Sequence, residues 1–225
     1  MEPLSPLVVL AGACRIYRVG RESVVALHPT TCAVAADSRI ALVGPPGSGK
    51  STLLKIMAGY DDPTIGTVTW PAIAPEMERP PESVAMICQA PALLPTMTVV
   101  ENVALPLQLS GTTPAEAMRV ATTALGLLEL DDLRDRGSDE ISAGEAQLVA
   151  VARALVGEPR LILADQPTEQ LDATMGTKVI DILVAAADHC RAGLVVATQD
   201  LLVADRLRER WSMAAGRLER LRPAC

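Results

Sequence analysis

The sequence predicts an α/β fold built around a largely parallel sheet, and three observations lead to this prediction. Four short apolar runs bounded by polar residues have the length of interior strands, and they span residues 39–43, 84–88, 160–164 and 193–198. Helical patterns follow or separate these runs at 53–59, 114–130, 143–156 and 173–187. A glycine-rich segment, 44–52, joins the first strand to the first helix. Strands that alternate with helices in this way are typical of α/β proteins with a parallel sheet.

The composition excludes several classes of protein. Of the 225 residues, 49% are hydrophobic and the net charge is −7, so a mostly disordered chain is excluded. No apolar run approaches the roughly 20 residues of a membrane-spanning helix, and we expect none. The excess of 27 acidic over 20 basic residues argues against nucleic acid as a partner. Five scattered cysteines without close spacing indicate neither a disulfide framework nor a metal framework, which suits a reducing compartment.

The chain is expected to form a single domain, 1–225, with a helical insertion. The block at about 90–156 is predominantly helical and separates the second predicted strand from the third. We therefore predict a core of residues 1–89 and 157–225 and a helical subdomain at about 90–156. The proline-rich stretch 71–82 is predicted to be a loop, because proline removes backbone donors and excludes helix.

The segment between the first strand and the first helix matches a phosphate-binding loop. Its glycines and the Lys50-Ser51 pair stand at the required spacing, so that backbone N–H groups can curl around phosphate oxygens. Lys50 would reach the β- and γ-phosphates, and the Ser51 hydroxyl would hold Mg²⁺. The residues expected to contact the nucleotide here are Gly44, Pro45, Pro46, Gly47, Ser48, Gly49, Lys50, Ser51 and Thr52.

A carboxylate stands at the end of the third predicted strand. Asp165 follows the apolar run 161–164, which places it at the carboxyl edge of a parallel sheet, where ligands of open α/β sheets bind. We predict that Asp165 is a direct or indirect partner of the Mg²⁺ of the nucleotide.

Beyond these two motifs, the order of short segments resembles the ATP-binding subunits of ABC transporters. The resemblance covers residues 17 to about 220, and its lipoprotein-release, macrolide-export and cell-division group looks closest. The matching segments are the loop 44–52, Gln89 after a strand, the signature segment 141–147, Asp165 to Thr168, Leu171-Asp172 and Thr198 to Asp200. The group is suggested by the stretches 17–20, 93–98 and 101–106.

The resemblance implies an α/β P-loop NTPase core with an N-terminal antiparallel β portion, ATP and Mg²⁺ as ligands, and particular roles for individual residues. Tyr17 would stack on adenine, and Gln89 would couple Mg²⁺ to a membrane subunit. Ser142 and Gly144 would clasp the γ-phosphate of ATP bound to a partner ATPase domain. Glu145 and Asp172 lie in the same motifs and are counted with the nucleotide-contacting residues.

The resemblance also implies partners and a location. A second ABC ATPase domain would complete a head-to-tail dimer with two ATP molecules at its interface. A separate membrane permease would dock near the segment 91–97. The protein would then lie on the cytoplasmic face of the cytoplasmic membrane as a peripheral subunit.

Several positions depart from the pattern of the family. Gln166 replaces the catalytic Glu, and Gln199 replaces the switch His. In the signature segment, Ala143 replaces a Gly, Glu145 replaces a Gln, and Leu148 replaces an Arg. A neutral amide has no usable basicity near neutral pH, and general-base participation contributes about 10²–10⁴-fold. We therefore predict that the chain binds ATP–Mg²⁺ but hydrolyses it slowly or not at all at its own site.

Three accounts of this site are open. In the first, which the departures favour, the chain is the degenerate half of an asymmetric pair. In the second, it forms a slow or silent homodimer that gates a permease by binding ATP. In the third, Gln166 is an engineered substitution that traps ATP. Two functions outside transport are also open. An ABC ATPase that acts on nucleic acid or ribosomes usually has two ATPase domains or a long inserted arm, which this chain lacks. The other function is that of an ATP sensor, which binds ATP and never hydrolyses it.

Overall fold

Two β-sheets organise the computed structural model, which describes residues 5–20, 22–73 and 83–221. The larger sheet has the strand order β5-β6-β7-β3-β8-β9. Its strands are β3 (Arg39–Val43), β5 (Val84–Ile87), β6 (Leu161–Asp165), β7 (Gly193–Thr198), β8 (Glu209–Ala214) and β9 (Arg217–Leu221). All neighbouring pairs from β5 to β8 are parallel, and β9 is antiparallel to β8. The mostly parallel sheet is thus confirmed.

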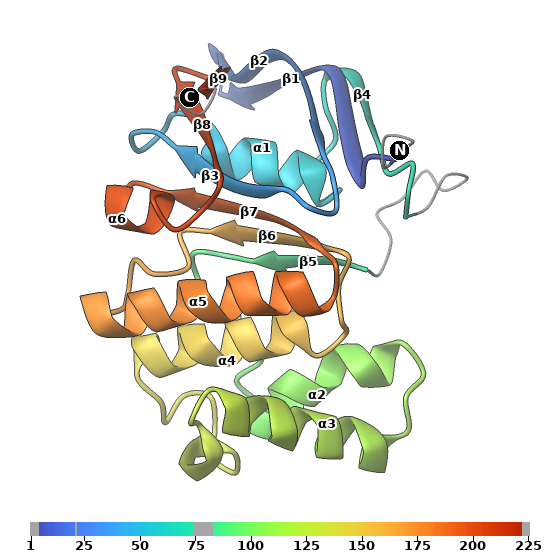
Figure 1. The fold of residues 1–225 in the computed structure, drawn as a ribbon, viewed down its shortest axis with the longest axis vertical. Helices are drawn as coiled ribbons and strands as arrows, with labels where there is room; N and C mark the ends of the chain where they lie inside the picture. Colours follow the sequence, from blue (N-terminus) through green and yellow to red (C-terminus); the bar gives the residue numbers. More distant parts are fainter. Residues whose placement is uncertain (1–4, 21, 74–82, 222–225) are drawn as a thin grey trace.

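A second, antiparallel sheet lies over one face of the first. It contains β1 (Val8–Val19), β2 (Glu22–Val34) and β4 (Ile65–Thr69), in the order β2-β1-β4. Helix α1 (Lys50–Met57) lies between the two sheets and contacts strands of both (Figure 1). The N-terminal antiparallel portion that the resemblance implied is therefore present.

The central strands are apolar along their whole length because both faces of the larger sheet are covered. In β3, Ile40 and Leu42 pack toward α1 and the antiparallel sheet, whereas Ala41 packs toward the helices on the opposite face. The same alternation occurs in β6 and β7. A strand buried on both faces reads as a continuous apolar run, which is how the sequence displayed it.

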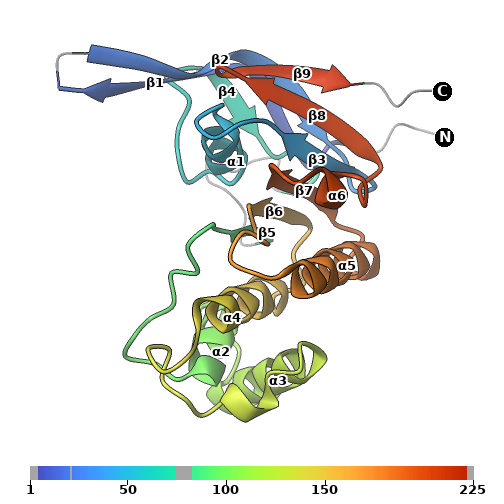
Figure 2. The ribbon, with the colours of Figure 1, turned by 90° about the vertical axis from the view of Figure 1, so that its left-hand side faces the viewer.

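Helices cover the opposite face of the larger sheet in two tiers. Helices α4 and α5 lie nearer the sheet and α2 and α3 lie beyond them (Figures 1 and 2). The helices of this side are α2 (Val99–Leu109), α3 (Pro114–Leu127), the 3₁₀ turn η1 (Asp131–Leu133), α4 (Ala143–Leu155), α5 (Ala173–His189) and the short α6 (Leu201–Ala204). One apolar cluster runs from α3 through α4 to the sheet, so the boundaries of a helical subdomain at about 90 and 156 stay a prediction.

Some element ends differ from the predicted ones for local reasons. The first helix begins at Lys50 and ends at Met57, rather than spanning 53–59. Helix α3 ends at Leu127 instead of residue 130, because Glu129 adopts a left-handed conformation and the Leu130 N–H returns to the Leu125 carbonyl. Helix α5 continues to His189, two residues beyond the predicted end.

Two further sequence predictions concern loops and membranes. Most of the proline-rich stretch 71–82 lies outside the described residues, and residues 71–73 form a turn. Among the described residues, no helix has both the length and the apolar character needed to cross a membrane.

Candidate functional site

The predicted phosphate-binding loop connects β3 to α1, and its backbone is packed too closely for side chains at two glycines. A Cβ at Gly44 would lie 2.1 Å from the Met213 carbonyl oxygen. Gly49 has a φ of 102° and precedes α1, and a Cβ there would lie 2.4 Å from the Ala26 carbonyl oxygen. These contacts exclude side chains where the chain turns tightly into a helix, and a glycine-rich loop at a helix N-terminus is the arrangement that attracts phosphate.

Lys50 bends back across this loop. Its Nζ donates hydrogen bonds to the carbonyl oxygens of Gly44, at 2.7 Å, and of Pro45, at 2.9 Å. Burial lowers the pKa of Lys50, and the nearby charges of Asp165 and Glu169 act in the opposite direction. The ammonium group is thus held inside the loop, where phosphate oxygens would replace the two carbonyls as its partners.

The remaining predicted residues of the loop lie around Lys50. Pro46 and Gly47 form its exposed tip, and the buried Ser48 hydroxyl has no hydrogen-bond partner among the described residues. Ser51 and Thr52 are half-buried in the first turn of α1. The structure therefore brings all nine predicted residues into one strand–loop–helix connection.

Asp165 is the last residue of β6 and is 4% exposed. Burial raises the pKa of its carboxyl group, and a hydrogen bond from Ser51 and the charge of Lys50 oppose that rise. Its Oδ1 is buried without a hydrogen-bond partner in the described part of the chain. Such an oxygen beside the Ser51 hydroxyl fits Mg²⁺, which binds proteins through one or two oxygen ligands and completes its shell with water and phosphate.

The two glutamines that replace family residues face one another. Gln199 Nε2 donates to Gln166 Oε1 at 2.8 Å, which joins the ends of β7 and β6. Gln166 has a φ of 50°, unusual for a residue other than glycine, and its N–H is held by the Ala197 carbonyl. Both side chains are neutral amides, so this pair can donate and accept hydrogen bonds but cannot remove a proton from water near neutral pH.

Gln89 follows β5, and its side chain contacts a carboxylate that the sequence reasoning missed. Gln89 Nε2 lies 2.5 Å from Glu169 Oε2. Glu169 stands four residues after Asp165, in the turn that leads to α5. Its nearness in sequence to Asp165 was the signal that could have indicated it as a residue of the site. The contact depends on residues 80 positions apart, so local motifs could not reveal it.

The signature segment begins α4 and has a self-contained hydrogen-bond arrangement. The backbone N–H and the hydroxyl of Ser142 each donate to Glu145 Oε2 at 2.7 Å, and the Glu145 N–H donates to the Ser142 hydroxyl at 3.3 Å. The hydrogen bond from the Ser142 backbone has the largest effect in lowering the pKa of Glu145, and the bond from the Ser142 hydroxyl adds to it. Since α4 and α1 cover opposite faces of the larger sheet, the structure does not bring Ser142 and Gly144 to the phosphate loop of the same chain (Figure 1).

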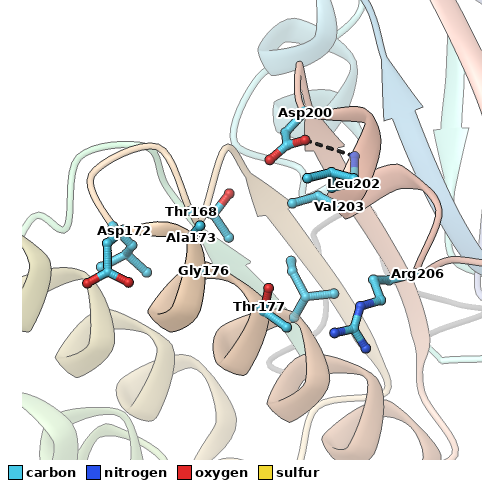
Figure 3. Close-up of a pocket in the computed structure, with 11 residues that line it drawn as sticks. Thr168, Asp172, Ala173, Gly176, Thr177, Asp200, Leu202, Val203 and Arg206 are labelled. Atoms are coloured by element: carbon cyan, nitrogen blue, oxygen red, sulfur yellow. Dashed lines mark hydrogen bonds between the residues drawn. The ribbon is translucent and has the colours of Figure 1, made fainter.

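Asp172 caps helix α5 and lines a cavity beside the site. Its Oδ1 accepts a hydrogen bond from the Met175 N–H at 2.9 Å. Figure 3 shows this cavity, about 310 Å³, between the first turns of α5 and the segment from Asp200 to Arg206. Of the predicted nucleotide-contacting residues, Asp172 lines it, and the phosphate loop does not.

Tyr17 lies on the β1–β2 hairpin, which runs past the phosphate loop. It pairs with Val24, two residues before Ala26, whose carbonyl packs against Gly49. The Tyr17 hydroxyl donates to Asp61 Oδ2, and the Arg15 guanidinium lies 4.8 Å from the ring centroid. One face of the ring is therefore covered by Arg15, and the role of Tyr17 in adenine binding stays a prediction.

The fold and this site together define a P-loop NTPase: a glycine-rich loop joins the parallel strand β3 to a helix, and a carboxylate ends β6, which β7 separates from β3. Comparison with known proteins narrows the class. The family model described as ABC transporter matches residues 27–169. The chain belongs to the ABC transporter family, as a nucleotide-binding ATPase subunit.

Solved structures agree with this assignment. A dimeric post-hydrolysis structure of the ATP-binding cassette MJ0796, bound to ADP and Pi, is 30% identical over 96% of this chain and 100% of that chain, with a TM-score of 0.86. Another dimeric MJ0796 structure, described as a bacterial ABC transporter cassette, has the same identity and a TM-score of 0.87. The cbiO1 protein of Clostridium perfringens, 22% identical over 95% of this chain and 87% of its own, has a TM-score of 0.76 and supports the fold. The closer relationship to the lipoprotein-release group stays a prediction.

Proposed function

We propose that this chain is the ATP-binding subunit of an ABC transporter complex and couples ATP-driven pairing of two ATPase subunits to a separate membrane permease. ABC ATPase domains generally bind ATP with Mg²⁺. The observation that carries the proposal for this chain is the intact set of the phosphate loop, Lys50, Ser51 and Asp165, with an unpartnered carboxylate oxygen at the expected metal position.

The same proposal includes impaired hydrolysis. Gln166 and Gln199 bond to each other at the carboxyl edge of the sheet, where the family has a carboxylate and an imidazole. Without a basic group at position 166, turnover at this site is slower by about 10²–10⁴-fold. The chain would therefore bind ATP well and hydrolyse it slowly, and an asymmetric pair with a fully catalytic partner ATPase explains this best.

The proposed partners follow from the relatives and from the surface. The MJ0796 cassettes are dimers, and cbiO1 is part of the ABC transporter complex cbiONQ. In this chain, Leu94 is 40% exposed in the segment after Gln89, which suits an apolar contact with a permease. We propose a peripheral location on the cytoplasmic face of the membrane on this basis.

Nucleotide binding tests the proposal directly. Equilibrium dialysis with Mg²⁺–ATP is expected to show saturable binding, and Lys50→Ala is expected to weaken it by about tenfold or more, because a charge-assisted hydrogen bond contributes about 1.5–3 kcal/mol. Lys178→Ala is the matched control, since Lys178 lies on α5, pairs with Glu129 and is far from the loop in sequence. Absence of binding, or equal binding by the Lys50 variant, would contradict the proposal. Co-purification of the native complex from membranes would then identify the permease.

A further inference from the structure

A small cavity adjoins the paired glutamines and is lined by carboxylates at positions other than 166. Its volume is about 310 Å³. The residues that line it are Gln166, Thr168, Glu169, Thr198, Gln199 and Asp200. Two of these, Glu169 and Asp200, carry carboxylates, and either could in principle act on water in the cavity.

The hydrogen bonds of the described residues distinguish the two carboxylates. Asp200 caps α6, and its Oδ1 accepts the Leu202 N–H at 2.8 Å (Figure 3). Glu169 caps no helix, is exposed, and receives one side-chain hydrogen bond, from Gln89 Nε2. Each carboxylate thus accepts one hydrogen bond and keeps acceptor positions for water, but Asp200 is bound to the start of α6, whereas Glu169 is bound to Gln89 at the end of β5.

Glu169 also lies close to the groups that would hold the phosphates and the metal. Its negative charge acts on both groups: it opposes the lowering of the Lys50 pKa by burial, and it adds to the raising of the Asp165 pKa by burial. Its partner Gln89 comes from a different segment, so Glu169 bridges the end of β5 and the turn after β6. Glu169 thus lines the same cavity as the Gln166–Gln199 pair, and its charge reaches Lys50 and Asp165.

We propose that Glu169 is the carboxylate that orients and deprotonates the attacking water in this chain, in place of the missing carboxylate at position 166. This inference rests on the proposed binding of ATP–Mg²⁺ at the site. In the hydrolytic step, the water oxygen forms a bond to the γ-phosphorus. The bond from the γ-phosphorus to the bridging oxygen breaks with its electron pair remaining on ADP. The proton of the water passes to the Glu169 carboxylate and then to solvent.

Moving the carboxylate between the two positions tests this proposal. In the full-length chain, Glu169→Gln is expected to lower kcat by about tenfold or more while the affinity for Mg²⁺–ATP stays the same, because a general base acts in the transition state. Gln166→Glu alone is expected to raise kcat. Gln166→Glu combined with Glu169→Gln is expected to recover at least the wild-type kcat, since one carboxylate again faces the water.

Two controls separate a direct role from an indirect one. Glu158→Gln removes an exposed carboxylate after α4 and is expected to change kcat by less than about twofold. A double-mutant cycle with Gln89→Ala asks whether Glu169 acts only by holding Gln89. Direct action predicts that Glu169→Gln lowers kcat further in the Gln89→Ala background.

Each contrary outcome identifies what fails. Three outcomes would overturn the role of Glu169. The first is an unchanged kcat in Glu169→Gln, and the second is no further loss of kcat when Glu169→Gln is added to Gln89→Ala. The third is a wild-type rate of ATP hydrolysis no higher than that of Lys50→Ala. Weakened ATP affinity in Glu169→Gln would overturn it too, because the residue would then serve binding. Loss of ATP binding by the wild-type chain would instead contradict the proposed function itself, so the two failures are distinguishable.

Discussion

At the scale of single residues, Tyr17 combines two contacts that hold its ring in place. Arg15 and Asp61 form an ion pair beside it, Asp61 accepts its hydroxyl, and Arg15 lies over the ring. An aromatic ring that is already fixed loses little freedom when a base stacks on its other face. This makes Tyr17 a suitable platform for adenine, the role that the family resemblance implies.

Replacing Tyr17 should therefore weaken nucleotide binding. Tyr17→Ala is expected to raise the Kd for ATP by about 5- to 150-fold, because stacking of a base on an aromatic side chain contributes about 1–3 kcal/mol. Tyr17→Phe keeps the ring but loses the bond to Asp61, and its Kd should stay close to that of the wild type. Titration with a fluorescent ATP analogue measures both. Equal weakening in the two variants would show that the hydroxyl, not the ring, matters.

The sequence predicted the members of the site better than their partners. The phosphate loop could be recognised because its residues are neighbours in the chain, and Asp165 could be recognised because it ends a strand. The bond between Gln166 and Gln199 and the contact between Gln89 and Glu169 join separate segments. Such contacts depend on the order of the strands in the sheet, and the spacing of residues along the chain does not predict that order.

At the scale of elements, the segment between β5 and α2 is held by buried polar groups. Asn102 on α2 is fully buried; its Oδ1 accepts the Leu94 N–H at 2.7 Å, and its Nδ2 lies within 3.1 Å of the Leu94 carbonyl oxygen. Arg153 on α4 donates to the carbonyls of Pro91 and Ala92. The chain that follows Gln89 is therefore attached to two helices rather than free in solvent.

Removing the Asn102 side chain should destabilise the whole fold. Asn102→Ala leaves partly buried backbone groups of this segment without their partner and opens a cavity at a buried position, at a cost of about 2–3 kcal/mol. For a chain of this size, Tm should fall by about 4–12 °C in a calorimetric scan. Gln108→Ala on the exposed face of α2 serves as the control and should leave Tm nearly unchanged. A similar Tm for both variants would mean that water replaces the lost hydrogen bonds.

Strands and helices were predictable to different degrees for physical reasons. Strands β3 and β7 have the predicted bounds because burial on both faces leaves an unbroken apolar run. Helix α2 received no separate prediction, although the capping box of Thr98 and Glu101 marks its start. The end of α3 depends on the left-handed Glu129, a conformation that no residue type there announces.

At the scale of the whole molecule, charge bears on how two copies would associate. Each chain has a net charge of −7, so two copies repel one another at low ionic strength. The family arrangement would also place the start of α4 against the γ-phosphate bound to the other subunit. In this chain the Glu145 carboxylate occupies that helix start through its bonds to Ser142. A helix N-terminus that would attract phosphate is thus partly neutralised by its own side chain.

Glu145 should consequently limit ATP-dependent self-association. Glu145→Gln keeps a side chain that can complete the capping box, since Glu and Gln both serve at this position, but it removes the charge. Sedimentation velocity with Mg²⁺–ATP should show weak dimerisation of the wild-type chain and about tenfold tighter dimerisation of the variant, because like charges at an interface are costly. The difference should shrink at high salt, where exposed charges are screened. Glu116→Gln on α3, where Glu116 pairs with Arg119, is the control and should dimerise as the wild type does. A wild-type chain that already dimerises tightly would contradict this view and would favour a homodimer over an asymmetric pair.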